Sequence, residues 1–336
     1  MLGTDDERGL PGDPALARRA CGASDAEMID YRSAMLQLHR LARCLRRQTA
    51  LTYAVEAVQR YAAGHHDRFR KAPYLAGRCN VCGRDTLFFC DDQRLYRESL
   101  NCAECGTTSR YRSIGRGVLR AMRELAGVDA CSVAELATTD SSARLRVYDT
   151  QVPFSLATVG YPIPELLGRC HWMEVHCSLY KPGRPPGEEL GPGITNQNLE
   201  KLTFPDGFFD LVITSDVMEH VRLDDRAHQE IARVLRPGGV YVFTVPHFRD
   251  RETLVRVRPA DPDDPSADVY LTEPEYHGDG NSPDGRALSY RSYGTDLDEY
   301  LTSLGLPVQY TMEDYSAVGI MNTELFYCRK ATCARL

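Results

Sequence analysis

The stretch that most constrains the fold lies between residues 198 and 247, where two buried-strand patterns flank a helix pattern. Residues 209–214 (FDLVIT) form a short apolar run between turn-forming and polar residues, which is typical of a strand buried on both faces. Residues 228–235 place apolar side chains at helical spacing before a Pro-Gly-Gly sequence that ends helices. Residues 240–245 (VYVFTV) predict a second buried strand. This order of strand, crossover helix and strand predicts a βαβ unit of a parallel sheet.

Four sequence blocks in this region carry a family resemblance. LTFPD, FDLVITS, EHV and LRPGG occur in this order, and at these separations they resemble the second half of a class I S-adenosylmethionine (SAM) dependent methyltransferase of the type 11-like group. The resemblance covers about residues 145–330. It implies a Rossmann-like α/β fold whose parallel sheet is closed by an antiparallel C-terminal hairpin. A helix at 297–304 and strands at 307–312 and 324–329 are expected to form that end of the domain.

The composition is ordinary for a globular protein. The chain has 336 residues, of which 43% are hydrophobic and 26% are charged, and it is long enough for two domains. No apolar run approaches the roughly 20 residues of a membrane helix, and the first residues lack a signal-peptide pattern, so we expect a cytoplasmic location. The net charge of −7 argues against nucleic acid as the main partner. We therefore expect a small-molecule substrate, and composition leaves the oligomeric state open.

Two Cys-x-x-Cys pairs predict a metal site. Cys79 and Cys82 form one pair, Cys102 and Cys105 form the other, and a glycine follows each pair. Each pair can point two thiolates at one centre, and two pairs match the tetrahedral sulfur coordination of structural Zn²⁺. With short strand candidates at 86–89 and 96–100, the module is similar to a zinc ribbon. Free thiols, iron or a redox dithiol are the alternatives.

Five segments are predicted along the chain. Residues 1–22 lack apolar periodicity and predict a disordered leader. A capping-box sequence from Ser24 to Glu27 opens an N-terminal helical region, residues 23–70. The remaining segments are the zinc ribbon at 71–110, a linker helix within 111–144, and the methyltransferase-fold domain at 145–336.

An arginine-rich amphipathic helix is predicted to begin near residue 107 and to end near residue 125. Apolar residues separate its five arginines, which are Arg110, Arg112, Arg116, Arg120 and Arg123. Such side chains could hold a phosphate or carboxylate. A solvated helix face is the simpler interpretation.

The cofactor loop departs from the family pattern. The resemblance implies that the strand at 145–149 is followed by a Gly-x-Gly loop that approaches SAM closely. This chain instead continues with Asp149, Thr150 and Gln151, and the first glycine after them is Gly160. Either side chains of this segment replace the backbone contacts, or the pocket serves another reaction. The sequence Tyr-Asp-Thr-Gln at 148–151 is similar to a methyltransferase-like subgroup with Tyr-acidic-Thr-Gln at this point.

Further cofactor contacts follow from the resemblance. A carboxylate at the end of the strand at 172–175 is expected to hold the ribose. Glu174 is the nearest candidate, His176 lies two residues further on, and the sequence does not rank them. Asn198 and Leu199 occupy the place where relatives contact the adenine. Ser215 and Asp216 follow the strand at 209–214, at the edge where open α/β sheets bind ligands. A Pro- and Gly-rich segment at 181–193 is a candidate lid.

The candidate catalytic residues lie after the two central strands. If a helix begins at Asp216, then Asp216, Glu219 and His220 share one face, and His220 is the candidate general base. An alternative is that Glu219 and His220 only cap or orient a helix. His247 follows the second strand, and Glu275 and His277 lie in a segment at 271–278 predicted to be a loop. His247 or Glu275 is the expected partner of His220. A metal site formed by His277, His247 and a carboxylate is conceivable, although no spacing requires one.

Several functions are compatible with these patterns. SAM-dependent methyl transfer to a small polar metabolite is the first hypothesis. The missing glycine loop motivates an enzyme of the same fold that catalyses a cyclisation or elimination instead. The zinc ribbon motivates an RNA methyltransferase or nucleic-acid-binding protein, although the acidic charge argues against it. A catalytically inactive scaffold is the remaining alternative.

Overall fold

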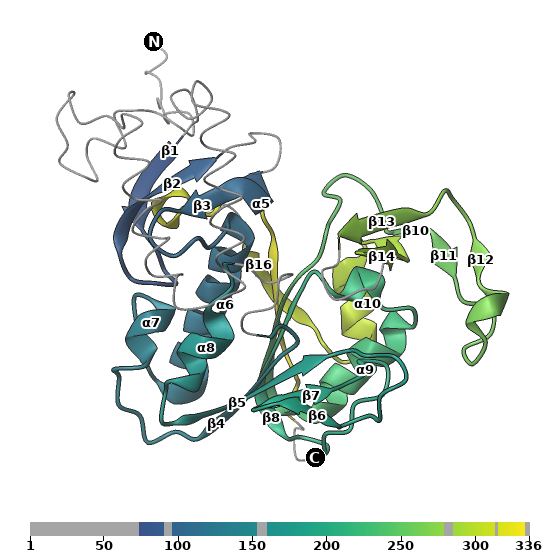
Figure 1. Ribbon diagram of the computed structural model, residues 1–336, viewed down its shortest axis with the longest axis horizontal. Coiled ribbons are helices and arrows are strands. Elements are labelled where there is room, and N and C mark those ends of the chain that lie inside the picture. Colours follow the sequence, from purple (N-terminus) through teal and green to yellow (C-terminus); the bar gives the residue numbers. More distant parts are fainter. Residues whose placement is uncertain (1–73, 91–95, 153–159, 279–284, 313–314, 333–336) are drawn as a thin grey trace, which may run out of the picture. The chain divides into compact units, whose positions relative to one another are not determined.

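The computed structural model describes residues 74–90, 96–152, 160–278, 285–312 and 315–332 (Figure 1). The leader and the helical region predicted for residues 1–70 lie outside the described residues. The chain divides into two compact units. We call residues 113–312 and 324–336 the sheet unit, and residues 1–112 and 313–323 the ribbon unit.

The sheet unit is built on an eight-stranded sheet with the strand order β16-β17-β9-β8-β4-β5-β7-β6. Its strands are β4 (Leu145–Asp149), β5 (Met173–Leu179), β6 (Glu189–Gly191), β7 (Ile194–Asn196), β8 (Phe209–Ser215), β9 (Leu235–Thr244), β16 (Val308–Met312) and β17 (Leu325–Arg329). The strands from β7 through β5, β4 and β8 to β9 run parallel, whereas β6, β17 and β16 pair antiparallel with their neighbours. The predicted Rossmann-like sheet with a C-terminal antiparallel hairpin is confirmed.

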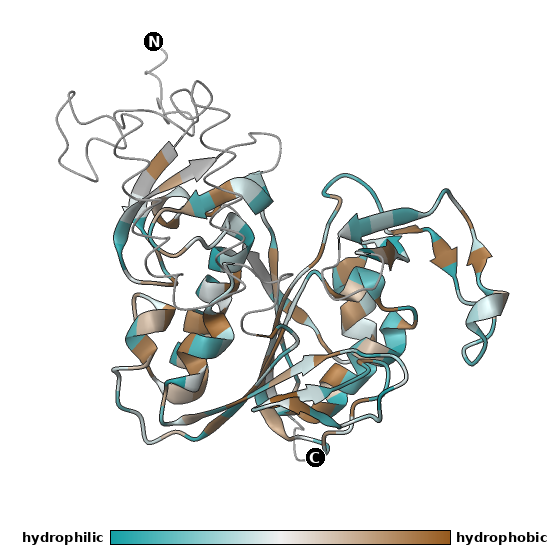
Figure 2. Cartoon of the chain, in the orientation of Figure 1, coloured by the Kyte–Doolittle hydropathy of each residue, from teal (hydrophilic) through white to brown (hydrophobic). Residues whose placement is uncertain are grey.

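Helices cover both faces of this sheet. They are α6 (Ser109–Ala126), α7 (Val133–Leu136), α8 (Ile163–Gly168), α9 (Asp224–Val234) and α10 (Leu297–Ser303). Residues of α9 and α10 form one hydrophobic core with strand residues such as Phe209 and Tyr241. Gly117 of α6 approaches the opposite face so closely that an added Cβ would lie 2.7 Å from side-chain atoms of Val242 and Leu325. Each of the helices α7 and α8 contains both hydrophobic and hydrophilic residues, as expected of helices that bury one side (Figure 2).

The burial of β8 and β9 explains why the sequence predicted them well. All seven residues of β8 are buried, which matches a continuous apolar run with helices on both faces. Along β9, Tyr241 and Phe243 stack with ring centroids 4.6 Å apart on the α9 side, where the ring of His228 lies 6.0 Å from each. Helix α9 ends at Val234, just before the Pro-Gly-Gly sequence. Strand β9 already begins at Leu235, so the Pro-Gly-Gly sequence lies within this strand.

Three sequence-based expectations about local structure are wrong. Asp216 does not begin a helix, because it adopts a φ of 49° and only Met218–His220 form a short 3₁₀ turn, η4. The predicted loop at 271–278 contains strand β13 (Glu275–Gly278), which pairs with β14 (Arg286–Ser289). The strand candidate at 96–100 is mostly the helical turn α5 (Tyr96–Ser99). For β13, pairing with a neighbouring strand overrides the local pattern.

The sheet unit also carries small two-stranded pairings within its 249–292 segment. Strands β10 (Leu254–Val255) and β15 (Arg291–Ser292) pair, as do β11 (Val257–Arg258) and β12 (Val269–Tyr270), with the 3₁₀ turn η5 (Pro265–Ala267) before β12. No helix in the described part of the chain combines the length and apolar character needed to cross a membrane.

The ribbon unit is a three-stranded antiparallel sheet, joined by a segment from the C-terminal part of the chain. Its elements are β1 (Tyr74–Arg78), β2 (Asp85–Cys90), β3 (Leu100–Cys102) and the 3₁₀ turn η6 (Ser316–Val318). The guanidinium of Arg112 is fully buried and donates to the carbonyls of Leu100 at 2.8 Å, Val318 at 2.9 Å and Gly319 at 2.6 Å. It also lies 4.3 Å from the centroid of the Phe88 ring. Arg112 is thus a structural residue and not part of a solvated helix face.

Candidate cofactor and catalytic sites

The carboxylate of Asp149 is buried at the carboxyl end of β4. It accepts a hydrogen bond from the backbone N–H of Gln151 at 2.9 Å and one from the hydroxyl of Tyr161 at 2.7 Å. Burial raises the pKa of Asp149 to about 7, although both hydrogen bonds oppose the shift. Tyr161 gave no signal in the sequence, because it lies twelve residues beyond the strand in a segment without a recognisable motif.

The segment after β4 is tied to the end of β8. The backbone N–H of Thr150 donates to the carbonyl of Ile213 at 3.1 Å, and the side-chain amide of Gln151 donates to the carbonyl of Ser215 at 3.0 Å. The hydroxyl of Thr150 is buried and has no hydrogen-bond partner among the described residues. A buried polar group without a partner is costly, so this hydroxyl marks a place where a ligand group would be stabilised.

The end of β8 is itself held by β9. The backbone N–H of Asp216 donates to the carbonyl of Thr244 at 2.9 Å, and the Thr244 hydroxyl donates to the Asp216 carboxylate at 2.8 Å. The Ser215 hydroxyl lies 3.4 Å from the same Thr244 hydroxyl. These bonds hold Asp216 in a left-handed backbone conformation, which is unusual for a residue other than glycine. Ser215, Asp216, Thr150 and Gln151 therefore meet at one edge of the sheet.

The expected position of Glu174 is wrong. In the parallel register Glu174 pairs with Arg146 and Cys177 pairs with Asp149, so Glu174 lies near the amino end of β5. It is exposed and binds Arg146 and His176. Strand β5 continues to Leu179, whereas the sequence pattern predicted that it would end at residue 175. The predicted ribose contact by Glu174 is therefore not supported by its position.

Asn198 and Leu199 lie in the turn before β8. The side-chain oxygen of Asn198 accepts from the backbone N–H of Glu200 at 2.9 Å, and the side chain of Leu199 packs into the core with α9. An adenine amino group that binds the side-chain oxygen of Asn198 would therefore compete with the backbone N–H of Glu200. Any contact made by Leu199 would come from its backbone.

Three of the predicted catalytic residues meet beside the η4 turn. Nε2 of His220 lies 3.2 Å from Nδ1 of His277, and Oε1 of Glu219 lies 3.7 and 3.9 Å from these two atoms. Glu219 is fully buried. The β13–β14 hairpin supplies His277, and the Tyr290 N–H just beyond it donates to the carbonyl of Glu219 at 2.8 Å.

The outer nitrogens of both rings are also bound. Nδ1 of His220 lies 2.9 Å from the carbonyl oxygen of Leu288, and Nε2 of His277 lies 3.1 Å from Oε1 of Glu275. Arg256 pairs with the other oxygen of Glu275. Burial alone would raise the pKa of Glu275, but His277 and Arg256 lower it. Glu275 thus contacts His277 and not His220, and neither Arg256 nor the Leu288 carbonyl was predicted, since no motif marks them.

His247 belongs to a separate group. It forms an ion pair with Glu324, which also binds Arg249 at 2.7 Å, and its Nε2 lies 2.9 Å from the carbonyl oxygen of Gly294. Burial alone would lower the pKa of His247, but Glu324 raises it above the ordinary value. No described contact joins His247 to His220 or His277. The described contacts therefore do not support the conceivable metal site of His247 with His277, nor His247 as the partner of His220.

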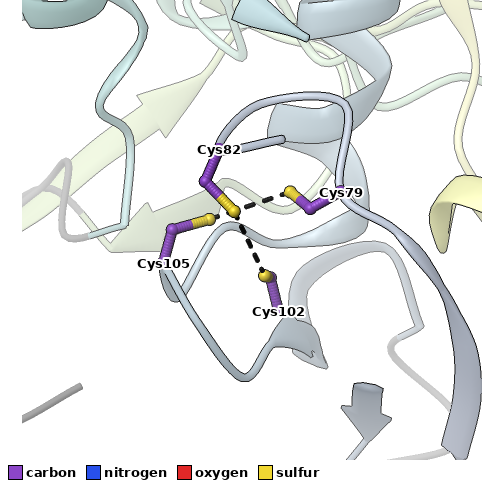
Figure 3. Close-up of side chains that lie close together, drawn as sticks. All are labelled: Cys79, Cys82, Cys102 and Cys105. Carbon is purple, nitrogen blue, oxygen red and sulfur yellow. Dashed lines mark hydrogen bonds between the residues drawn. The ribbon is translucent and has the colours of Figure 1, made fainter. Parts of the chain in front are cut away.

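The four cysteines of the two Cys-x-x-Cys pairs converge in the ribbon unit (Figure 3). Sγ of Cys79 lies 3.8 Å from Sγ of Cys105, and Sγ of Cys82 lies 4.0 Å from Sγ of Cys102. Zinc–sulfur bonds of about 2.3 Å in tetrahedral geometry place the sulfurs about 3.8 Å apart. Gly83 and Gly106 adopt positive φ of 73° and 74°, which lets each pair turn back on itself. The donor set therefore fits Zn²⁺.

Three of the other four arginines predicted on α6 are engaged with carboxylates. Within the ribbon unit, Arg110 binds Glu98 at 2.8 Å. Within the sheet unit, Arg120 binds Glu124 at 2.7 Å. Arg123 binds Asp129 at 2.5 Å. These exposed pairs favour the interpretation of a solvated helix face.

Comparison with known proteins gives partial matches. Residues 180–243 match the family described as "Methyltransferase domain". The ubiquinone/menaquinone biosynthesis C-methyltransferase UbiE of Hydrogenovibrio crunogenus is 51% identical over 45 residues, which are 13% of this chain and 18% of that protein. The UbiE protein of Psychromonas ingrahamii is 32% identical over 88 residues, which are 24% of this chain and 35% of that protein. The matched stretches thus span at most 35% of these relatives' own length.

Solved structures with a similar arrangement share little sequence. A SAM-dependent methyltransferase from Mesorhizobium loti is 18% identical with a TM-score of 0.34, and the match covers 58% of this chain and 95% of that one. The 1,6-didemethyltoxoflavin-N1-methyltransferase of Burkholderia thailandensis is 14% identical with a TM-score of 0.34, and the match covers 65% of this chain and 79% of that one.

Proposed function

Because the chain belongs to the class I SAM-dependent methyltransferase superfamily, we propose that it transfers a methyl group from SAM to a small polar metabolite. The observation that carries this proposal is the edge of the sheet where β4 and β8 end side by side. There, polar groups of Thr150, Gln151, Ser215 and Asp216 gather without the usual glycine loop. Ligands of open α/β sheets bind at this edge.

We propose that side chains replace the missing glycine contacts to the cofactor. The buried Thr150 hydroxyl, which has no hydrogen-bond partner among the described residues, is the group best placed to bind a polar atom of SAM. The Gln151 amide fixes this segment to Ser215, and Asp149 is held by Tyr161. When bound, SAM supplies an electrophilic methyl group. The protein must then only align an acceptor and remove its proton.

His220 is the proposed group for that proton. Its Nδ1 faces a backbone carbonyl, which can only accept, so Nδ1 must carry a hydrogen and Nε2 holds the lone pair. Nε2 is in turn linked through His277 to Glu275. This series of side chains can carry a proton away from His220, through His277, to the Glu275 carboxylate.

We propose that the four cysteines of the ribbon unit bind a structural Zn²⁺ ion. The spacing of the sulfurs, the two tight turns and the buried positive charge of Arg112 in the same unit support this proposal. An ion held by four protein sulfurs has no open position for a substrate. Its role would therefore be to stabilise a module too small to fold on its own core.

Isothermal titration calorimetry with SAM tests the proposed activity. We expect the chain to bind SAM, and we expect Thr150→Val to weaken binding by about tenfold, the effect of losing one hydrogen bond worth about 1.4 kcal/mol. Thr138→Val is the matched control, because its exposed hydroxyl only caps a local turn at 3.0 Å from the carbonyl of Glu135. Absence of SAM binding by the intact chain at high micromolar concentration would refute the proposed function.

A further inference from the structure

The cluster at the η4 turn has the geometry of a metal site. Three potential ligand atoms, Oε1 of Glu219, Nε2 of His220 and Nδ1 of His277, lie 3.2, 3.7 and 3.9 Å apart. Tetrahedral bonds of about 2.0–2.1 Å to nitrogen and oxygen would place such atoms about 3.3 Å apart. A contraction of about half an ångström at the Glu219 edges would complete three ligand positions.

The hydrogen bonds of the two rings favour the same conclusion. The Leu288 carbonyl requires a hydrogen on Nδ1 of His220, and the Glu275 carboxylate, which Arg256 holds in its charged form, requires one on Nε2 of His277. Two neutral rings would then direct two lone pairs at each other across 3.2 Å. Either an additional proton or a cation must lie between them. A metal ion satisfies both nitrogens and also the buried Glu219 carboxylate, which faces the same point.

The outer contacts are those that support metal-binding histidines. Such a histidine usually donates its other N–H to a carboxylate or a backbone carbonyl, which fixes the ring and its tautomer. Here His277 donates to Glu275 and His220 donates to Leu288. The backbone N–H of Tyr290 donates to the carbonyl of Glu219 at 2.8 Å. This bond holds Glu219 beside the hairpin that supplies His277. These hydrogen bonds therefore position the ligands before any ion binds.

We propose that Glu219, His220 and His277 bind a divalent transition-metal ion, and that Zn²⁺ is the ion their donor set fits best. Two imidazoles and one carboxylate leave at least one coordination position open, as in zinc sites that bind substrate or water. That position would take an oxygen of the methyl acceptor, such as a hydroxyl or enol. This role in substrate binding rests on the proposed methyltransferase function, whereas the metal site itself does not.

The ion would change how the acceptor loses its proton. With the ion bound, Nε2 of His220 is a ligand and no longer accepts a proton. The positive charge instead lowers the pKa of the bound acceptor oxygen, as it does for metal-bound water, so the O–H bond breaks and its proton passes to solvent. The oxygen would keep that electron pair and attack the methyl carbon of SAM, while the methyl–sulfur bond breaks and its electron pair leaves with the sulfur of S-adenosylhomocysteine. The ion is neither oxidised nor reduced.

Metal content after equilibration with Zn²⁺ and removal of free ion tests the site. We expect the intact chain to retain two ions, one at the four cysteines and one at this cluster. His277→Ala, which changes a partly exposed ring, and Glu219→Gln should each retain only the cysteine-bound ion. His171→Ala is the matched control. This exposed histidine pairs with Asp140 at 3.1 Å, lies outside the proposed ligand set, and its loss should leave two ions.

Cobalt substitution separates the two ions by their ligands. The cysteine site gives thiolate-to-cobalt charge-transfer bands, whereas the proposed cluster adds only weaker bands that His277→Ala removes. Retention of one ion by the intact chain, with a cobalt spectrum that His277→Ala leaves unchanged, would overturn the proposed site and leave His220 as the base. SAM calorimetry on the same samples distinguishes the two proposals. Metal uptake without SAM binding would count against methyl transfer and not against the metal site.

Discussion

At the scale of single residues, the surroundings of His228 strongly alter its chemistry. It lies in α9, is fully buried, and is enclosed by the rings of Tyr241, Phe243 and Tyr300, each 6.0 Å away. Neither of its ring nitrogens has a hydrogen-bond partner among the described residues. Burial lowers the pKa of His228 to about 3. The folded chain therefore holds this ring neutral at all ordinary pH values.

We predict that His228 weakens the fold as the pH falls. Between pH 6.5, where the unfolded histidine binds a proton, and about pH 3, the unfolded chain carries one proton more at this site than the folded chain. The free energy of unfolding should fall by about 1.4 kcal/mol per pH unit across this window. In His228→Leu this contribution disappears. Urea unfolding of both proteins at pH 7.5 and pH 5.5 measures the difference, and an equal loss of stability in both would contradict the prediction.

The residue scale also shows where sequence patterns did not suffice. The cysteine pairs lie in the tight turns that their spacing predicted, and Asp216 directly follows β8 as predicted, although His220 lies in a 3₁₀ turn and not in the expected helix. Glu174 was misplaced because β5 continues for four residues beyond the apolar pattern. The Leu288 carbonyl that binds His220 and the arginine that pairs with Glu275 were missed because no motif marks them. Contacts made through pairing of distant strands cannot be predicted from local spacing.

At the scale of elements, β8 and β9 follow from pattern because burial on both faces leaves a continuous apolar run, whereas α9 follows from the helical spacing of its buried residues. Strand β13 was missed for the opposite reason. Its residues alternate between intermediate and exposed, so no apolar period reveals a hairpin that is held by backbone pairing with β14. That hairpin brings His277 to His220. The site therefore depends on an element that the sequence pattern does not predict.

Gly117 tests how closely α6 packs on the sheet. We predict that Gly117→Ala destabilises the sheet unit by about 1–3 kcal/mol, since its Cβ would lie 2.7 Å from atoms of Val242 and Leu325. This cost exceeds the roughly 1 kcal/mol that alanine gains over glycine in a helix. Gly168→Ala in α8 is the control, because no atom lies within 4 Å of its added Cβ. It should be neutral or slightly stabilising in urea unfolding, and a stabilised Gly117→Ala would refute the close contact.

At the scale of the whole molecule, the ribbon unit is assembled from segments far apart in the sequence. Arg112 binds the carbonyl of Leu100 in the first segment and that of Gly319 in the second. The Ser109 hydroxyl donates to the carbonyl of Met321 at 2.8 Å. The sequence pattern predicted only a turn between the last two strands, since residues 313–323 carry no motif. The connection between β16 and β17 is nevertheless part of the ribbon unit. Loss of the ribbon fold should therefore also release residues 315–323.

We predict that metal removal unfolds the ribbon unit while the centre of the sheet unit remains folded. Structural zinc contributes on the order of 10 kcal/mol to small modules, so chelation should accelerate amide hydrogen exchange in β1, β3 and residues 315–323 by at least ~100-fold. Amides of β8 should keep their protection, because their partners are β4 and β9. Cys105→Ser should reproduce the effect without chelator, and Cys131→Ser, which changes an exposed free thiol, should not. Unchanged exchange in β1 and β3 after verified metal removal would show that the four sulfurs do not hold the ribbon together.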